Sequence, residues 1–337
     1  MIIMAGKGKT HQRIFAILTY LNQYAKNGES INIKELQDYL GELSSERQII
    51  YNDLQEMELA GVGITHDKNK HYYYDNKSFT DGELSLLADV ICSSSYLDAK
   101  SAEELILHIK QMTTMDKFDD LTKDTNIFLR NKTLNSECIK NIDILHNAIR
   151  EKKQIEFNYS KYNNTGELIK SGKRTVSPYN LVWDNSQCYL IAGIKYKGVT
   201  ELRIYRADKI FNLTSLENEI YYPISKNPFF NAKSKNINAE KFIKSVFGMY
   251  GSKNNELTKV DFLVKNELIG VIYDKFGFDI NRKKHDENYF TFSADIQISN
   301  MFFGWISSFK PDEIRILNPK KLKQEYKSYL NEITDVY

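Results

Sequence analysis

The stretch from residue 154 to residue 209 contains five short segments that are rich in β-branched and aromatic residues. The segments are 155–159, 176–179, 180–183, 188–193 and 202–206. Turn residues, among them Asn, Asp, Ser and Gly, lie between several of these segments. Short apolar runs punctuated in this way are typical of the strands of a small all-β barrel or sandwich. We therefore expect a compact β module in the middle of the chain.

The predicted β module is also the basic part of the chain. Residues 150–217 contain 12 Lys/Arg and 7 Asp/Glu, whereas the whole chain has a net charge of only +2. In the last predicted strand, Arg203 and Tyr205 alternate with two apolar residues, so a cation and a ring share one face. Guanidinium groups bind phosphates and aromatic rings stack on bases, which suits a nucleic acid. The alternative is an ordinary solvated strand face.

The order of several motifs in this stretch resembles the WYL domain, a family named for a Trp-Tyr-Leu tripeptide. The motifs are Ile155-x-Phe157-x-Tyr159, Arg174-x-x-x-Pro178-Tyr179, Cys188-Tyr189-Leu190 and the run from Arg203 to Ile210. Cys188 stands where the family has Trp, and Tyr205 and Lys209 stand where it has Phe and Arg. The resemblance implies a small SH3/Sm-like β-barrel that senses a ligand, often nucleic acid or a nucleotide, behind a DNA-binding domain.

Combining this resemblance with side-chain chemistry, we predict a site in which arginines bind phosphate and tyrosines stack on bases. The predicted ligand-binding residues are Tyr159, Arg174, Tyr189, Arg203, Tyr205 and Arg206. We expect no metal, no cofactor and no catalytic residues here, because the carboxylates of the module are scattered along the sequence and it contains no His.

Residues 1–77 have the pattern of a helix-turn-helix. Apolar residues recur at helical spacing over three segments. The predicted helices are Thr10–Tyr24, Lys34–Leu40 and 45–60. Ser45 and Gln48 have the spacing of a capping box that would open the third helix. Two helices joined by a short turn, with the second well capped, predict a helix-turn-helix.

A β-hairpin is predicted directly after the third helix. Its strands are 62–66 and 71–74, and a polar turn at 67–70 joins them. A hairpin in this position predicts the wing of a winged helix-turn-helix. The segment Ile50–Leu54 resembles the recognition helix of DeoR-type regulators, with Asn52 where those proteins have Arg.

The side of the third helix opposite its apolar stripe is expected to enter the major groove of DNA. The predicted DNA-binding residues are Ser45, Arg47, Gln48, Tyr51 and Asn52 on the helix, and Lys68 and Lys70 on the wing. Arg and Gln make bidentate contacts to guanine and adenine, respectively, and the remaining residues suit phosphates. Residues 1–77 contain 9 Lys/Arg and 10 Asp/Glu, so a winged helix that binds protein instead of DNA is the alternative.

A chain of 337 residues is too long for one ordinary hydrophobic core, so we predict an α+β multidomain protein. The predicted domains are a winged helix-turn-helix (1–77), an acidic helical connector and dimerisation region (78–150), the β-barrel (151–220) and a C-terminal α+β domain (235–337). The last domain resembles the C-terminal extension that follows WYL domains in many regulators.

The cysteines and the apolar segments indicate the compartment. Cys92, Cys138 and Cys188 lie far apart, which argues against a disulfide framework and a zinc site and favours a reducing, cytoplasmic environment. The first residues lack an apolar region long enough for a signal peptide. No segment approaches the roughly 18 apolar residues of a membrane span, so we expect no membrane partner.

The combined patterns predict a homodimeric transcriptional regulator that binds a double-stranded DNA operator. Its β module is expected to sense a nucleic acid or nucleotide effector, and repression is the expected outcome of operator binding. One alternative is a nucleic-acid-processing enzyme or its accessory subunit, which would use the basic module to hold its substrate. Such chemistry normally requires clustered carboxylates or a His beside a nucleophile, and neither pattern is present in the module. A pure interaction scaffold is the third possibility.

Overall fold

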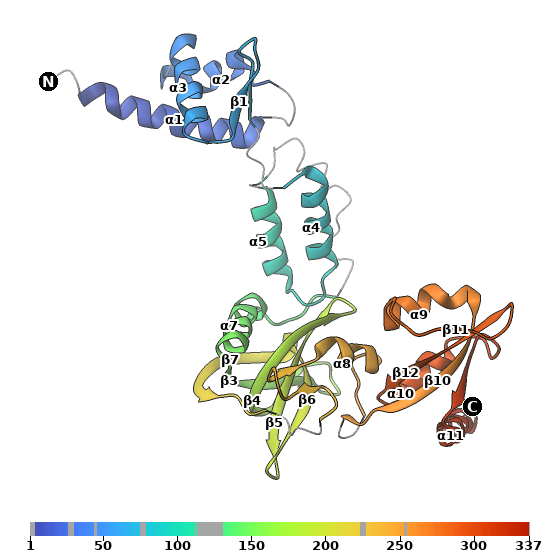
Figure 1. The fold of residues 1–337 in the computed structure, drawn as a ribbon. Helices are drawn as coiled ribbons and strands as arrows, with labels where there is room; N and C mark the ends of the chain where they lie inside the picture. Colours follow the sequence, from blue (N-terminus) through green and yellow to red (C-terminus); the bar gives the residue numbers. More distant parts are fainter. Residues whose placement is uncertain are drawn as a thin grey trace. The chain divides into compact units, whose positions relative to one another are not determined.

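The structure is a computed structural model that describes residues 4–25, 30–43, 46–74, 79–110, 112, 131–222, 227–252 and 255–336. The chain divides into two compact units, Met1–Ser136 and Glu137–Tyr337 (Figure 1). Both units contain helices and strands, which confirms the mixed α+β class. Within the described ranges, every helix is too short or too polar to cross a bilayer.

The first unit begins with helices and a hairpin. Its first elements are α1 (Met4–Tyr24), α2 (Ile33–Leu40), α3 (Arg47–Leu59), β1 (Ile64–His66) and β2 (Tyr72–Tyr74). The two strands pair antiparallel with Thr65 opposite Tyr73. The predicted helices and the predicted hairpin are therefore present, although α1 begins before Thr10.

The apolar stripes of these helices meet in one core. Leu21 of α1, Leu36 of α2 and Leu54 of α3 are fully buried, and Ile64 and Tyr72 of the hairpin close the cluster. Because each stripe recurs at helical spacing, three short helices bury their apolar faces against one another and leave their polar faces in solvent.

The two short helices start differently. Asn32 caps α2, since its Oδ1 accepts hydrogen bonds from the backbone N–H groups of Lys34 (3.1 Å) and Glu35 (3.3 Å). At α3 the N-cap is Glu46, whose side chain makes no capping bond. The predicted Ser45–Gln48 capping box stays a prediction, because Ser45 lies outside the described residues.

The described part of the predicted connector contains α4 (Asp81–Ser93) and α5 (Ala99–Lys110). A capping box that the sequence analysis did not predict opens α4: Glu83 N–H donates to Thr80 Oγ1 (3.3 Å) and Glu83 Oε2 accepts from Thr80 N–H (2.7 Å). At the other end, the Lys132 ammonium donates to the carbonyls of Ile91 (3.1 Å), Cys92 (2.8 Å) and Ser94 (2.7 Å). A cation on these carbonyls satisfies the end of the helix.

The second unit is built around a five-stranded antiparallel sheet. Its elements are α7 (Cys138–Glu151), β3 (Lys153–Tyr162), β4 (Leu168–Asp184), β5 (Gln187–Tyr196), β6 (Val199–Arg206) and β7 (Ile210–Glu219). The strand order is β6-β5-β4-β3-β7, so β6 and β7 are the edges. Within residues 131–222 no ladder joins these two edges, and closure into an SH3/Sm-like barrel stays a prediction.

Helix α7 packs on this sheet and belongs to the second unit. The side-chain amide of Asn141 donates to the carbonyl of Ile210 (2.8 Å), and both residues are buried. The predicted boundary at residue 150 placed this helix in the connector. The structure divides the chain after Ser136 instead, because the buried side of α7, which includes Leu145 and Ala148, needs the sheet to cover it.

The remaining part of the second unit begins with two short strands and a helix, and a βαββαβ order with a final added helix follows. The elements are β8 (Phe230–Asn231), β9 (Asn236–Ile237), α8 (Ala239–Ser245), β10 (Thr258–Lys265), α9 (Ile269–Phe276), β11 (Lys283–Lys284), β12 (Tyr289–Ile296), α10 (Asn300–Ser307), β13 (Ile314–Asn318) and α11 (Lys320–Thr334). The sheet order β11-β12-β10-β13 with all neighbours antiparallel is that of a split βαβ, or ferredoxin-like, arrangement.

Two hydrophobic cores meet near residue 247. Phe242 and Val246 of the α8 region pack with Ile191 and Leu202 of the five-stranded sheet, whereas Phe262 belongs to the C-terminal core. The predicted domain start at residue 235 therefore divides the first of these cores. The apolar side of α8 covers the outer face of β5 and β6, and this packing positions the segment that follows it.

Candidate ligand-binding pocket

A pocket of about 970 Å³ lies between strands β5 and β6 on one side and residues 248–252 and Asn255 on the other. Its lining residues are Tyr159, Tyr189, Glu201, Leu202, Arg203, Ile204, Arg206, Gly248, Met249, Tyr250, Gly251, Ser252 and Asn255. Four predicted ligand-binding residues meet there: Tyr159, Tyr189, Arg203 and Arg206. Arg174 and Tyr205 do not line the pocket.

Strand register explains why Tyr205 is separated from Tyr189 and Arg206, whereas Arg203 leaves the edge strand on the same side as Tyr205. Tyr189 pairs with Arg206 across β5 and β6, and Leu190 pairs with Tyr205, so successive pairs alternate between the two faces of the sheet. Tyr205 is 7% exposed, and its ring lies 5.4 Å from that of Phe157 and 5.3 Å from that of Tyr159. The prediction that Tyr205 presents a free stacking surface is wrong, because packing of these rings buries it.

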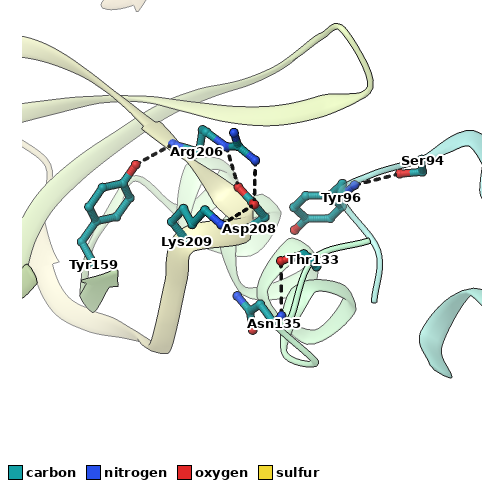
Figure 2. Close-up of polar contacts among 8 residues, drawn as sticks. All are labelled: Ser94, Tyr96, Thr133, Asn135, Tyr159, Arg206, Asp208 and Lys209. Atoms are coloured by element: carbon teal, nitrogen blue, oxygen red, sulfur yellow. Dashed lines mark hydrogen bonds and ion pairs between the residues drawn. The ribbon is translucent and has the colours of Figure 1, made fainter. Parts of the chain in front are cut away.

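Arg206 is held by a buried carboxylate behind the pocket. Its Nε donates to Asp208 Oδ1 (3.0 Å) and its Nη2 to Asp208 Oδ2 (2.9 Å), and Asp208 is 1% exposed (Figure 2). Lys209 Nζ lies 3.3 Å from the same carboxylate (Figure 2). The backbone N–H of Arg206 donates to the hydroxyl of Tyr159 (3.2 Å) (Figure 2). The hydrogen bond to Asp208 raises the pKa of Arg206. The guanidinium is therefore fixed in place, with two of its five donors used by the protein.

The two other predicted arginines are placed differently. The Arg203 side chain is 57% exposed, and its Nη2 lies 2.7 Å from Glu201 Oε2. Arg174 turns back on its own strand, where it donates to the carbonyls of Lys173 (3.0 Å) and Ser171 (3.4 Å). Burial raises the pKa of Tyr205, and the positive charges of Arg174 and Arg203 oppose that rise. Arg203 is thus available to a ligand in the pocket, whereas the structure engages Arg174 with the backbone.

The first comparison with known proteins concerns the five-stranded sheet and helix α7. Residues 140–215 match the sequence profile of the WYL domain. This segment is a WYL domain. No curated protein matches the chain.

Two solved structures are similar to the chain. Proteasome accessory factor B/C (PafBC) of Arthrobacter aurescens is 16% identical with a TM-score of 0.27, and the similarity covers 95% of this chain and 47% of that one. A CRISPR Cas-related protein is 13% identical with a TM-score of 0.35, and the similarity covers 98% and 92% of the two chains. The chain thus spans about half the length of the PafBC structure. At these TM-scores, neither likeness supports an argument about fold or function.

The tripeptide that names the WYL domain is Cys188-Tyr189-Leu190 in this chain. Cys188 and Leu190 are fully buried, and Tyr189 is half-buried on the opposite face, where it lines the pocket. Burial raises the pKa of the Cys188 thiol to about 12 and also raises the pKa of Tyr189. Cys188, which stands where the family has Trp, therefore lies in the core and not in the pocket lining.

The WYL domain supplies only one wall of the pocket. The other wall, residues 248–252 and Asn255, lies C-terminal to the matched region and was not predicted. Gly248 and Gly251 lie on either side of Tyr250, and paired glycines of this kind indicate a turn in the sequence. Spacing in the sequence gave no indication that this turn would face β6.

The predicted DNA-binding residues fall into three groups. Arg47, Gln48 and Asn52 are exposed on α3, and Lys68 and Lys70 are exposed in the hairpin turn. Tyr51 is half-buried with its ring 6.0 Å from that of Tyr72, so it supports the hairpin instead of projecting outward. Ser45 lies outside the described residues. Gln55, one turn beyond Asn52, is exposed as well and was missed.

Contacts among the exposed residues order the surface of α3. Gln48 Nε2 donates to Asn52 Oδ1 (3.1 Å), and Arg47 Nε donates to Gln37 Oε1 on α2 (3.3 Å). These are neutral or solvent-exposed bonds, which a base edge or a phosphate can replace at small cost. In the described parts of the chain, no group of three or more His, Cys, Asp or Glu side chains is arranged to hold a metal ion.

Proposed function

We propose that this chain is a DNA-binding transcriptional regulator, acting as a homodimer in the cytoplasm, whose WYL domain binds a nucleic acid or nucleotide effector. The observation that carries the proposal is the pocket in which Tyr189, Arg203 and Arg206 converge. Repression by occupation of an operator is the expected mode of action.

The arrangement of the first unit supports DNA binding. Helices α2 and α3 with the β1–β2 hairpin have the order of a winged helix-turn-helix, in which α3 would enter the major groove. Arg47 and Gln48 are exposed at its N-terminal turn, where recognition helices contact bases. Because the charge of this region is close to neutral, one copy would bind weakly, and a dimer on two half-sites would combine the contacts.

The chemistry of the pocket supports an anionic, aromatic effector. Arg203 and Arg206 supply two positive charges and Glu201 one negative charge. Tyrosine rings with arginines are the combination that binds single nucleotides and single strands. Effector binding would alter operator binding only if the two states of the regulator bind the effector unequally.

A nucleic-acid-processing enzyme is the second candidate. Among the described residues that line the pocket, Glu201 is the one carboxylate, and it lies beside Arg203. Phosphodiester hydrolysis by metal ions normally uses several carboxylates. Incubation with labelled single and double strands in the presence of magnesium separates the readings: turnover supports the enzyme, and binding without turnover supports the regulator. A pure interaction scaffold would bind neither the single strands nor the double strands, even at low salt.

The test of the proposed function uses Arg203→Ala. The full-length variant should bind the operator, located by footprinting upstream of its own gene, as the unchanged protein does, and should lose the effect of added effector strands. Arg206→Lys serves as the second variant, because it keeps a charge near Asp208 and avoids leaving that carboxylate with Lys209 alone. Lys173→Ala, an exposed substitution on the same sheet, is the control. An intact effector response in Arg203→Ala would refute the proposal.

A further inference from the structure

The second wall of the pocket is a tight turn. The N–H of Tyr250 donates to the carbonyl of Phe247 (3.0 Å), and Gly248 and Met249 both have positive φ, +55° and 60°. Met249 is 6% exposed and belongs to the core beneath β5 and β6, whereas Tyr250 is 64% exposed and lines the pocket. The buried methionine therefore anchors the turn, and the turn presents the tyrosine ring.

A buried glutamine fixes this turn from behind. Gln297 is 0% exposed; its Oε1 accepts from the N–H of Ser252 (3.0 Å) and its Nε2 donates to Ser245 Oγ (3.1 Å). A Cβ on Gly251 would lie 2.7 Å from Gln297 Oε1, so only glycine fits this close approach. A fully satisfied buried amide of this kind makes the backbone of the turn rigid.

The turn is also tied to the edge of the WYL sheet. The side-chain amide of Asn255 donates to the carbonyl of Leu202 on β6 (3.3 Å). Edge strands have unpaired backbone groups, and this bond covers one of them. The separation between Tyr250 and the strand that carries Arg203 is thus set by packing, by Gln297 and by this bond. A backbone held in this way loses little conformational entropy when a ligand stacks on the ring that it presents.

Building on the proposed function, we infer that Tyr250 is the base-stacking residue of the pocket and that the effector is a single strand, of which the pocket takes one nucleotide. The base stacks on Tyr250 beside Tyr189, and the phosphodiester lies on Arg206, which shares a face of the sheet with Tyr189.

Charge and size support one nucleotide of a strand. The two arginines and Glu201 leave one net positive charge, which matches the single negative charge of a phosphodiester better than the nearly double charge of a free monophosphate. A volume of about 970 Å³ is at the upper end of ordinary ligand sites and is too small for a duplex. Bases in a duplex are also paired and stacked, so Tyr250 would meet an accessible base face only in a single strand.

The experiment measures binding of a short oligonucleotide that contains 2-aminopurine to the full-length protein by fluorescence. Stacking on an aromatic side chain contributes about 1–3 kcal/mol per base, so Tyr250→Ala should weaken binding by about 5- to 150-fold. Tyr250→Phe, which keeps the ring, should bind as the unchanged protein does. Phe278→Ala is the control, because Phe278 is 81% exposed and lies outside the pocket lining.

A strand of the same length without bases tests whether Tyr250 acts on the base. On this strand Tyr250→Ala and the unchanged protein should bind equally; an equal loss on both strands would overturn the inference, because Tyr250 would then act through the fold. Equal affinity for adenosine 5′-monophosphate and for the oligonucleotide would overturn the assignment of a strand. If Arg203→Ala weakens binding and Tyr250→Ala does not, the inference fails while the proposed function stands. If the unchanged protein binds no nucleotide or strand, both fail.

Discussion

Arg13 and Asp53 join α1 to α3 through a buried pair. Arg13 Nη2 donates to Asp53 Oδ1 (3.0 Å), and Arg13 Nε also contacts this carboxylate. Their side chains are 10% and 6% exposed. The pair sets where α3 lies on α1, and thus which α3 residues face solvent. Asp53 also lies within the helix predicted to enter the major groove, and in this structure it holds that helix on α1.

Removing one partner of this pair should destabilise the first unit. We expect Asp53→Ala to lower its free energy of unfolding by about 3 kcal/mol, because the variant leaves the Arg13 charge buried without its partner. Chemical denaturation monitored by circular dichroism measures the loss. Glu56→Ala, exposed on the same helix, is the control and should change stability by less than about 0.5 kcal/mol. A change as small in Asp53→Ala would contradict the assigned role.

Lys275 is a half-buried charge at the junction of the two cores in the second unit. Its ammonium donates to the carbonyls of Ile243 (3.1 Å) and Val246 at the C-terminal end of α8, and lies 4.4 Å from the centre of the Phe247 ring. Burial lowers its pKa from 10.5 to about 8. The lysine therefore satisfies the end of the helix that covers β5 and β6, at the cost of removing its charge from water.

The lowered pKa of Lys275 makes stability depend on pH in a defined direction. Below pH 8 the lysine is protonated in both states, and its desolvation cost is fully present. Between about pH 8 and pH 10.5 the unfolded state holds more protons, so this lysine makes stability rise with pH. We expect Lys275→Met to remove this rise, which is at most about 3 kcal/mol.

Urea denaturation of both proteins at several pH values, with exposed Lys320→Met as the control, measures the difference. Parallel pH profiles for the unchanged protein and Lys275→Met would show that the ammonium titrates normally.

At the scale of elements, α3 and the β1–β2 hairpin form the surface that we expect to touch DNA. Arg47 and Gln48 project from the first turn of α3, and Lys68 and Lys70 from the hairpin turn. Tyr51 and Tyr72 pack against each other between these elements, so side-chain contact joins the helix to the hairpin. A base contact and a phosphate contact should respond differently to mutation, which separates the two roles.

Substitution of the hairpin lysines should weaken DNA binding without changing its sequence preference. We expect the double variant Lys68→Ala, Lys70→Ala to lose affinity on every sequence and to reduce the slope of log Kd against log salt by about 2, one for each phosphate contact.

Arg47→Ala should instead cost about 1–3 kcal/mol on the preferred sequence and relax the preference at one base pair. Titration of operator and scrambled duplexes at several salt concentrations distinguishes the outcomes. Unchanged affinity in both variants would favour a winged helix that binds protein.

At the scale of the whole molecule, the division after Ser136 separates the predicted reader of DNA from the predicted sensor. Helix α7 lies on the sensor side, because Asn141 and Leu145 are buried against the WYL sheet. The C-terminal part belongs to the same unit, since it supplies α8 and the turn with Tyr250. A sensor restricted to the WYL segment would therefore lack one wall of its own pocket.

Fragments test this division. We expect residues 137–337 to fold alone and to bind the oligonucleotide as the full chain does, while losing operator binding. Residues 151–337, which lack α7, should unfold at a lower temperature, because the sheet face under Leu145 and Ala148 would be exposed to water. Thermal unfolding and fluorescence binding measure both. Equal stability of the two fragments would show that α7 belongs with the connector, as its place in the predicted domains implied.

Much of the fold could be predicted from the sequence because the relevant patterns are local. Apolar residues at helical spacing predicted α1, α2 and α3, and strand alternation with turn residues predicted the hairpin and β3, β5 and β6. The predicted segments 176–179 and 180–183 form one strand, β4, and β7 was not predicted. The predicted boundaries at residues 150 and 235 each lie beside an amphipathic helix, α7 or α8, that packs on the following or preceding sheet. Periodicity shows that such a helix has an apolar face and does not show which surface covers it.

The sequence by itself determined the types of element, the basic character of the central module and the chemistry of its side chains, since each depends on neighbours within a few residues. Tertiary packing alone decided that Tyr205 is buried against Phe157, that Arg174 turns to its own backbone, and that Tyr250 faces the strand of Arg203. These outcomes depend on strand register and on contacts between residues far apart in the chain. Such contacts form only where the gain from burial and satisfied polar groups exceeds the loss of conformational entropy, and no local pattern encodes that balance.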